Sequence, residues 1–71
     1  MDPKDIFELI IKADEKVKYS TADNADVREG QARELLVRAR DEARAIANDQ
    51  LVEQAERRLT DLGAEGPGSP G

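Results

Sequence analysis

The chain contains no cysteine and no histidine. Without cysteine it can form neither a disulfide framework nor a thiolate metal site. Without histidine it also lacks the commonest metal ligand and general acid–base group. Only carboxylates, hydroxyls, lysines and Tyr19 remain for chemistry. We therefore predict that the protein is not an enzyme and that it holds no metal or other cofactor.

Aromatic residues and long apolar runs are also scarce. There is no tryptophan, and phenylalanine and tyrosine occur once each, so the chain has no aromatic pair for stacking RNA bases. No apolar run approaches the ~20 residues that cross a bilayer, and the N-terminus lacks the basic segment and apolar core of a signal peptide. We expect a cytoplasmic protein that does not contact membranes.

The charge balance is acidic, with 16 acidic and 11 basic residues and a formal net charge of −5. Binding to nucleic acid needs clustered, uncompensated lysine and arginine, so we expect no nucleic-acid partner. The sequence has no phosphate-binding glycine loop and no nucleophile elbow, so we expect no small-molecule substrate. The carboxylates of Asp23, Asp26 and Glu29 lack the spacing of a calcium loop and are assigned to helix capping.

A chain of 71 residues buries only roughly 60% of the surface that it exposes when unfolded, so one small core is the most it can form. Within that limit, the apolar spacing predicts three helices, over about residues 3–20, 24–47 and 50–62. The abundance of alanine, arginine, aspartate, glutamate and glycine is typical of a GC-rich bacterial genome.

The first helix has three start signals: Asp2 at the N-cap, Pro3 at the first helical position and Asp5 in the first turn. Its core-facing stripe consists of Ile6, Leu9, Ile10, Ala13, Val17 and Ser20. On its outer side, Glu8–Lys12 and Asp14–Lys18 are spaced for ion pairs. Residues 20–24 favour local backbone hydrogen bonds and predict the connection to the second helix.

The second helix is the longest and begins at Asp23 or Asn24, either of which is a good N-cap. Its alanine-rich core-facing stripe consists of Ala25, Ala32, Leu35, Leu36, Ala39, Ala43 and Ile46. Gly30 lies inside this helix and costs it about 1 kcal/mol relative to alanine; we attribute it to a close helix crossing or a frayed first turn. Outer-face ion pairs are expected for Glu29–Arg33 and Glu34–Arg38.

A single long helix over residues 23–62, as in a coiled coil, is excluded by the apolar spacing. The stripe should continue at positions 50 and 53, but both residues there are polar. It resumes instead at Val52, Ala55, Leu59 and Leu62. This change of phase predicts a turn, with Asn48 in a left-handed conformation and Asp49 as the N-cap of the third helix. Gly63 is expected to end that helix, and residues 64–71 are expected to form a disordered tail.

Three amphipathic helices with short links predict an all-α fold. We expect a small antiparallel three-helix bundle over residues 1–63, with a disordered C-terminal tail over residues 64–71. The second helix should lie at its centre, and no internal repeat is long enough to define a second unit.

Some apolar residues do not point toward that core. Phe7 and Ile11 are four residues apart and lie roughly 100° from the centre of the first helix's stripe. Val37 lies off the stripe of the second helix, and Leu51 lies at the edge of the stripe of the third. Either the core is wide enough to take them, or Phe7, Ile11 and Val37 form a patch for another protein or for a second copy. Tyr19 is expected on the surface and is a further candidate contact.

Three arginines, Arg33, Arg40 and Arg44, lie near one side of the second helix. One interpretation is a charged rim that contacts an acidic partner or a phosphate. Asp41 beside them favours a solvated, ion-paired face instead.

The spacing of Ala32, Leu36, Ala39 and Ala43, followed by a turn and a shorter helix, resembles the second helix of a tetratricopeptide repeat and the start of the next repeat. The resemblance covers residues 30–63. The chain departs from that family in having no Trp or Gly–Tyr pattern in its first helix, no proline at the repeat end, and at most one and a half repeats where about three are usual. The resemblance implies peptide or protein binding along an exposed helical groove. Three-helix modules of the microtubule-interacting-and-trafficking type are similar in size and arrangement.

We therefore predict a small non-catalytic interaction or adaptor domain that uses an apolar patch on its first helix to bind another protein or itself. Two other classes remain open. An acidic regulatory protein, such as an antitoxin-like inhibitor or a nucleic-acid mimic, would bind with steep salt dependence and tolerate mutation of Phe7. A docking segment of a larger enzyme system would need residues 64–71 for binding.

Overall fold

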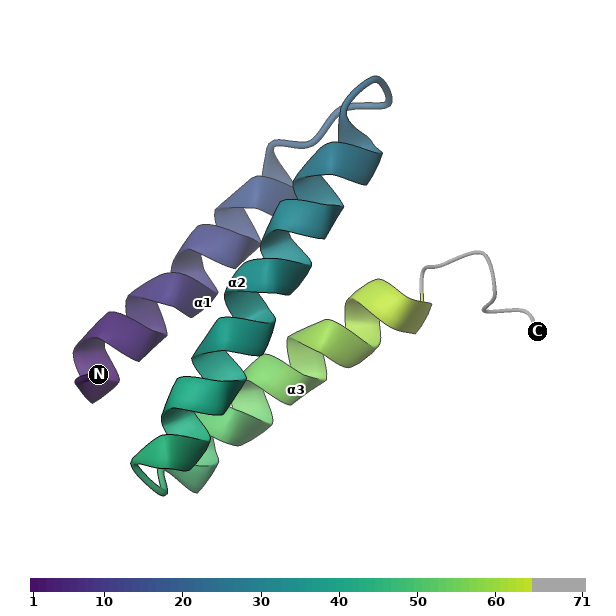
Figure 1. The fold of residues 1–71 in the computed structure, drawn as a ribbon. Coiled ribbons are helices and arrows are strands. Elements are labelled where there is room, and N and C mark those ends of the chain that lie inside the picture. Colours follow the sequence, from purple (N-terminus) through teal and green to yellow (C-terminus); the bar gives the residue numbers. More distant parts are fainter. Residues whose placement is uncertain (65–71) are drawn as a thin grey trace.

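The computed structural model describes residues 1–64, which form three α-helices and no strand. The helices are α1 (Pro3–Lys18), α2 (Ala25–Ala45) and α3 (Asp49–Ala64). Figure 1 shows α1 and α2 side by side and antiparallel, with α3 running back from the lower end of α2 at an angle to it. Both α1 and α3 pack along α2 but touch each other little. The predicted antiparallel three-helix bundle with a central second helix is confirmed.

The core is small and entirely aliphatic. Its buried residues are Ile6, Ile10, Ala13, Ala32, Leu36, Ala39, Ala43, Leu51, Ala55 and Leu62. Partly buried residues packed against them are Leu9, Val17, Leu35, Val52 and Leu59. Apart from Leu36, the buried positions of α2 are alanines. Because alanine side chains are short, both neighbouring helices can approach α2 closely, and Leu36 supplies most of its buried apolar volume.

Two stripe assignments were wrong. Ile46, expected to face the core, is exposed because it is the C-cap of α2, where the chain leaves the helix and its periodicity. Leu51, placed at the edge of its stripe, is buried because it lies one turn before Ala55 on the same face of α3.

The connection between α1 and α2 is longer than predicted, since α1 ends two residues early. Ser20 is therefore outside α1, and its hydroxyl donates a hydrogen bond to the carbonyl of Val17 at 2.8 Å. Asn24 is the N-cap of α2, but its side chain does not cap the helix. Its Oδ1 instead accepts a hydrogen bond from the backbone N–H of Thr21 at 2.7 Å.

The connection between α2 and α3 is the predicted tight turn, but the left-handed residue is Ala47 (φ 55°) and not Asn48. The N–H of Ala47 donates to the carbonyl of Arg44 at 3.0 Å, and the N–H of Asn48 donates to the carbonyl of Ala43 at 2.8 Å. These are the two hydrogen bonds of a Schellman motif, which satisfies the last carbonyls of α2.

Asn48, and not the predicted Asp49, caps the N-terminus of α3. The Oδ1 atom of Asn48 accepts a hydrogen bond from the backbone N–H of Leu51 at 3.1 Å, which is the side-chain interaction of an N-cap. Asp49 is then the first residue of the helix, where its carboxylate still faces the positive end of the helix dipole.

The predicted end of α3 was also wrong by a short distance. Gly63 was expected to terminate the helix, but α3 continues through Gly63 to Ala64. Of the predicted disordered tail, Ala64 belongs to α3, and residues 65–71 lie outside the described residues.

Candidate interaction surface

The surface of α1 carries two exposed large apolar side chains. Phe7 is 43% exposed and Ile11 is 40% exposed, whereas Ile6 and Ile10, each one position earlier, are fully buried. Because successive helical residues are turned by about 100°, these four side chains divide between two faces of α1. Of the two alternatives for Phe7 and Ile11, a widened core or an exposed patch, the structure has the second arrangement.

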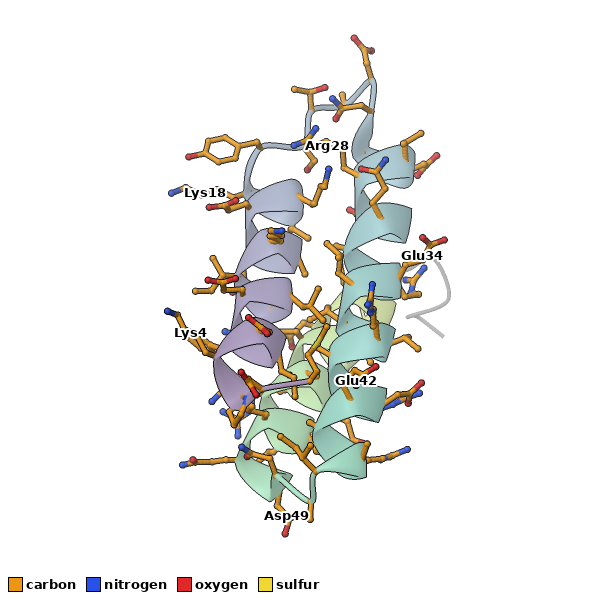
Figure 2. All side chains as sticks on the ribbon, turned by 60° about the vertical axis from the view of Figure 1, so that its left-hand side comes forward. Lys4, Lys18, Arg28, Glu34, Glu42 and Asp49 are labelled. Atoms are coloured by element: carbon orange, nitrogen blue, oxygen red, sulfur yellow. The ribbon has the colours of Figure 1, made fainter. Side chains whose placement is uncertain are left out.

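Phe7 and Ile11 belong to a line of residues that runs along the whole of α1. We call this line the α1 ridge; its members are Lys4, Phe7, Ile11, Asp14 and Lys18. They are separated alternately by three and four residues, the spacing of one seam on a helix. Figure 2 shows that Lys4 and Lys18, at the two ends of the ridge, point away from α2.

Asp14 connects the α1 ridge to α3. The Nε–H of Arg58 donates to both carboxylate oxygens of Asp14, at 2.9 and 3.0 Å, and Arg58 Nη1 donates to the carbonyl of Gln54 at 3.3 Å. This interaction replaces the predicted pair between Asp14 and Lys18. It joins the two helices of the bundle that otherwise touch each other little.

A cleft of about 420 Å³ lies between α1 and α3 next to this ion pair. Its lining consists of Ala13, Asp14, Val17, Lys18, Leu36, Arg58, Asp61 and Leu62. The cleft has an apolar floor and a rim of two carboxylates and two basic groups. Because Asp14 and Lys18 also belong to the α1 ridge, the ridge and the cleft form one continuous surface. The sequence did not predict the cleft, since its width depends on the inclination of α3 (Figure 1).

Val37 does not lie beside the α1 ridge. It is partly exposed and lines a shallow depression formed by α2 alone, with Gly30, Arg33, Glu34, Arg38, Asp41 and Glu42. Glu34, on this depression, points away from α1 in Figure 2. The structure therefore does not bring Val37 together with Phe7 and Ile11. A Cβ added at Gly30 would meet nothing within 4 Å, so of the two explanations for this glycine the close helix crossing was wrong.

Tyr19 is 61% exposed at the C-cap of α1. The Nζ atom of Lys18 lies 5.5 Å from the centroid of its ring, within the range of a cation–π interaction. Tyr19 follows Phe7 by twelve residues, roughly 18 Å along the helix axis. It therefore marks the far end of α1 and not the apolar centre of the ridge.

The three candidate rim arginines have different surroundings. Arg40 pairs with its neighbour Asp41 at 3.3 Å, and Arg44 pairs with Glu56 of α3 at 2.8 Å. For these two arginines the predicted ion-paired face is confirmed. Arg33 is exposed and lines the depression on α2.

Ion pairs in residues 1–64 differ from those that helical spacing predicted. The predicted pairs Glu8–Lys12, Asp14–Lys18, Glu29–Arg33 and Glu34–Arg38 do not form in this part of the chain. Two of the pairs that do form join α3 to another helix. Sequence spacing within one helix could not reveal them, because their partners are brought together only by the fold.

Charge is distributed by helix. All four lysines lie in α1, and all seven arginines lie in α2 and α3. α1 carries four basic and four acidic residues, and α2 carries five of each, so both helices are formally neutral. The net charge of −5 comes from α3, with two basic and four acidic residues, and from Asp2, Asp23 and Glu65. The acidic surplus is thus divided among separate segments of the chain.

Sequence reasoning also missed Val27, which is 63% exposed in the first turn of α2. The sequence could have predicted its exposure, because this valine lies off the apolar stripe of its helix, as Val37 does. Within residues 1–64, no three carboxylates lie close enough together to hold a metal ion. None of the helices in the same residues is long and apolar enough to cross a membrane.

Comparison of the chain with protein-family models, curated proteins and solved structures found no match. The resemblance to a tetratricopeptide repeat therefore stays a prediction. The four residues that carry it, Ala32, Leu36, Ala39 and Ala43, are the buried residues of α2. Any closely packed alanine-rich helix shares that placement.

Proposed function

We propose that this chain is a non-catalytic protein-interaction or adaptor module of the cytoplasm, and that it binds through the α1 ridge and the adjoining cleft. The observation that carries the proposal is the exposure of Phe7 and Ile11 on a helix whose other large apolar side chains are buried or partly buried. The small–large–small spacing on α2 is compatible with the same function.

The chemistry of the ridge is that of a small binding site. Interfaces derive most of their affinity from a few aromatic or aliphatic anchors, surrounded by polar groups that fix orientation. Phe7 and Ile11 supply such anchors, and Lys4 and Lys18 supply charges at the two ends of the ridge. A helix or extended peptide laid along α1 would cover the anchors and place a side chain in the cleft.

The distribution of charge favours this proposal over an acidic mimic of nucleic acid. A mimic needs its carboxylates concentrated on one face, so that their fields add. Here α1 and α2 are formally neutral, and the acidic surplus is divided between α3 and three further residues, Asp2, Asp23 and Glu65.

Site-directed photocrosslinking in the source cells tests the proposal. A photoreactive residue is placed at position 11, on the ridge, and separately at position 27, where the exposed apolar residue lies on α2. We expect discrete crosslinked products from position 11 because a partner covers the ridge. Phe7→Ala in the position-11 protein should reduce their yield several-fold, since it removes an anchor.

Position 27 is the matched control, because both sites are exposed apolar positions in helices. The proposal predicts few or no discrete products there. Equal products from both positions, or none from position 11, would show that the α1 ridge is not a binding surface.

A further inference from the structure

We propose that the partner of the α1 ridge is a second copy of this chain, with the two α1 helices packed antiparallel across a two-fold axis. The inference rests on the proposed function and names its partner. It is carried by the order of apolar and charged residues along the exposed side of α1.

The ridge has the spacing of a helix-pairing seam. Phe7 and Ile11 occupy its centre, and charged residues occupy both ends. In an antiparallel pair with the two-fold axis beside residue 9, Phe7 packs against Ile11 of the second copy, and Ile11 packs against Phe7 of the second copy. All four exposed apolar side chains then meet in one cluster, as an isologous interface requires.

The same register pairs opposite charges. Lys4 lies opposite Asp14 of the second copy, which is already bound to Arg58, and one residue from Glu15, which is not ion-paired within residues 1–64. Glu8 is one residue from the axis and is as near along the helix to Glu8 of the second copy as to Lys12, so it favours neither orientation. None of the α1 lysines is ion-paired within residues 1–64, so these groups are available. A parallel pair would instead place Lys4 against its own counterpart, with like charges facing each other.

Net charge also favours α1 as the contact between two copies. Each copy carries −5, so association through an acidic face would be opposed by repulsion. α1 is formally neutral, with all four lysines of the chain. α2 is neutral too, but its outer face offers only isolated valines and the depression around Gly30.

The size of the surface sets the affinity. A helix of 16 residues is about 24 Å long, and one helix face buries less than the ~1,600 Å² of a standard interface. We therefore expect a reversible dimer with a Kd on the order of 10–100 µM.

Sedimentation equilibrium on the full chain tests the inference through a charge swap. Lys4→Glu and Glu15→Lys each replace two attractions across the axis with two repulsions, so each variant should raise the dimer Kd about tenfold. The double variant, and an equimolar mixture of the two single variants, restore opposite charges at both positions. Both samples should regain the wild-type Kd.

Arg38→Glu and Glu34→Lys on α2 are the controls, because they change the net charge by the same amounts at exposed positions outside the ridge. They should leave the Kd within about twofold of the wild type. Far-UV circular dichroism of each variant confirms that it is folded.

Two results would overturn the inference. A wild-type chain that stays monomeric up to about 1 mM removes the second copy as the partner, while the photocrosslinking test of the ridge still stands. A dimer that is insensitive to the two single variants, or is not restored by the charge swap, shows that the copies do not pair antiparallel through α1.

Discussion

Ile10 and Ile11 have the same side chain and adjacent positions, but their environments differ. Ile10 is fully buried, while Ile11 is 40% exposed. Complete burial of an aliphatic side chain contributes roughly 1.5–3 kcal/mol relative to exposure. Ile10 therefore contributes chiefly to the stability of the monomer, and much of the apolar surface of Ile11 remains available for association.

Ala47 holds the only left-handed backbone conformation of a non-glycine residue among residues 1–64. Its Cβ strains that conformation, because the left-handed region costs an ordinary residue about 1 kcal/mol that glycine avoids. We predict that Ala47→Gly raises the free energy of unfolding by about 0.5–1 kcal/mol, measured by urea denaturation. Ala45→Gly, at the last residue of α2, is the control and should not raise it, because residue 45 has a helical and not a left-handed backbone. A destabilised Ala47→Gly protein would contradict the turn geometry.

The same turn shows why sequence reasoning placed its residues one position too late. Asparagine is favoured both at left-handed positions and at N-caps, and Asn48 was assigned to the first role. In the structure its Oδ1 accepts the N–H of Leu51, so Asn48 has the second role and the left-handed position falls on Ala47. Residue preference could not decide between the two roles, because both turns use the same residues in a different register.

At the scale of elements, the three helices and their order were predictable because each has a repeated apolar face and a marked start. Apolar spacing fails where the helix stops, as at Ile46, and where two faces compete, as at Leu51. The ion pair between Asp14 and Arg58 and the cleft beside it were not predictable. They depend on how α3 is inclined toward α1, which no local pattern encodes.

Gly30 lies in the interior of α2 with open space around it. Alanine there would contact no neighbouring residue, so it would cause no steric clash in the folded state. It would also restrict the backbone of the unfolded chain, which makes folding more favourable. We predict that Gly30→Ala raises the free energy of unfolding by about 0.5–1 kcal/mol, measured by thermal or urea denaturation. A loss of stability would mean that another helix approaches α2 at this position, contrary to the structure.

For the whole molecule, the main consequence of the fold is that α1 has two different faces. One face, with Ile6 and Ile10, packs in the core, while the ridge of Phe7 and Ile11 faces solvent. A bundle of this size has a free energy of unfolding of only roughly 5 kcal/mol. The loss of one buried side chain would therefore remove a large part of its stability. Phe7 and Ile11 are 43% and 40% exposed, so they add less to that stability than Ile6 and Ile10 do, and we interpret their exposure through binding.

The division of α1 into a buried face and an exposed face also limited how far the sequence could predict the binding site. Helical spacing separated Phe7 and Ile11 from the stripe, but it could not tell a wide core from an exposed patch. That distinction depends on how far α2 and α3 extend around α1. Grouping Val37 with them failed for a related reason, because the rotation of α2 about its own axis is fixed only in the packed bundle.

The most direct test of this account compares Ile10→Asp with Ile11→Asp by urea unfolding at low micromolar concentration, followed by far-UV circular dichroism. A carboxylate at position 10 would be buried without a partner at a cost of several kcal/mol, so Ile10→Asp should lose its cooperative transition. Ile11→Asp should keep a cooperative transition and lose no more than about 2 kcal/mol, because its side chain is only partly covered. If Ile11→Asp is instead as unstable as Ile10→Asp, the α1 ridge is part of the core and not a free surface for binding.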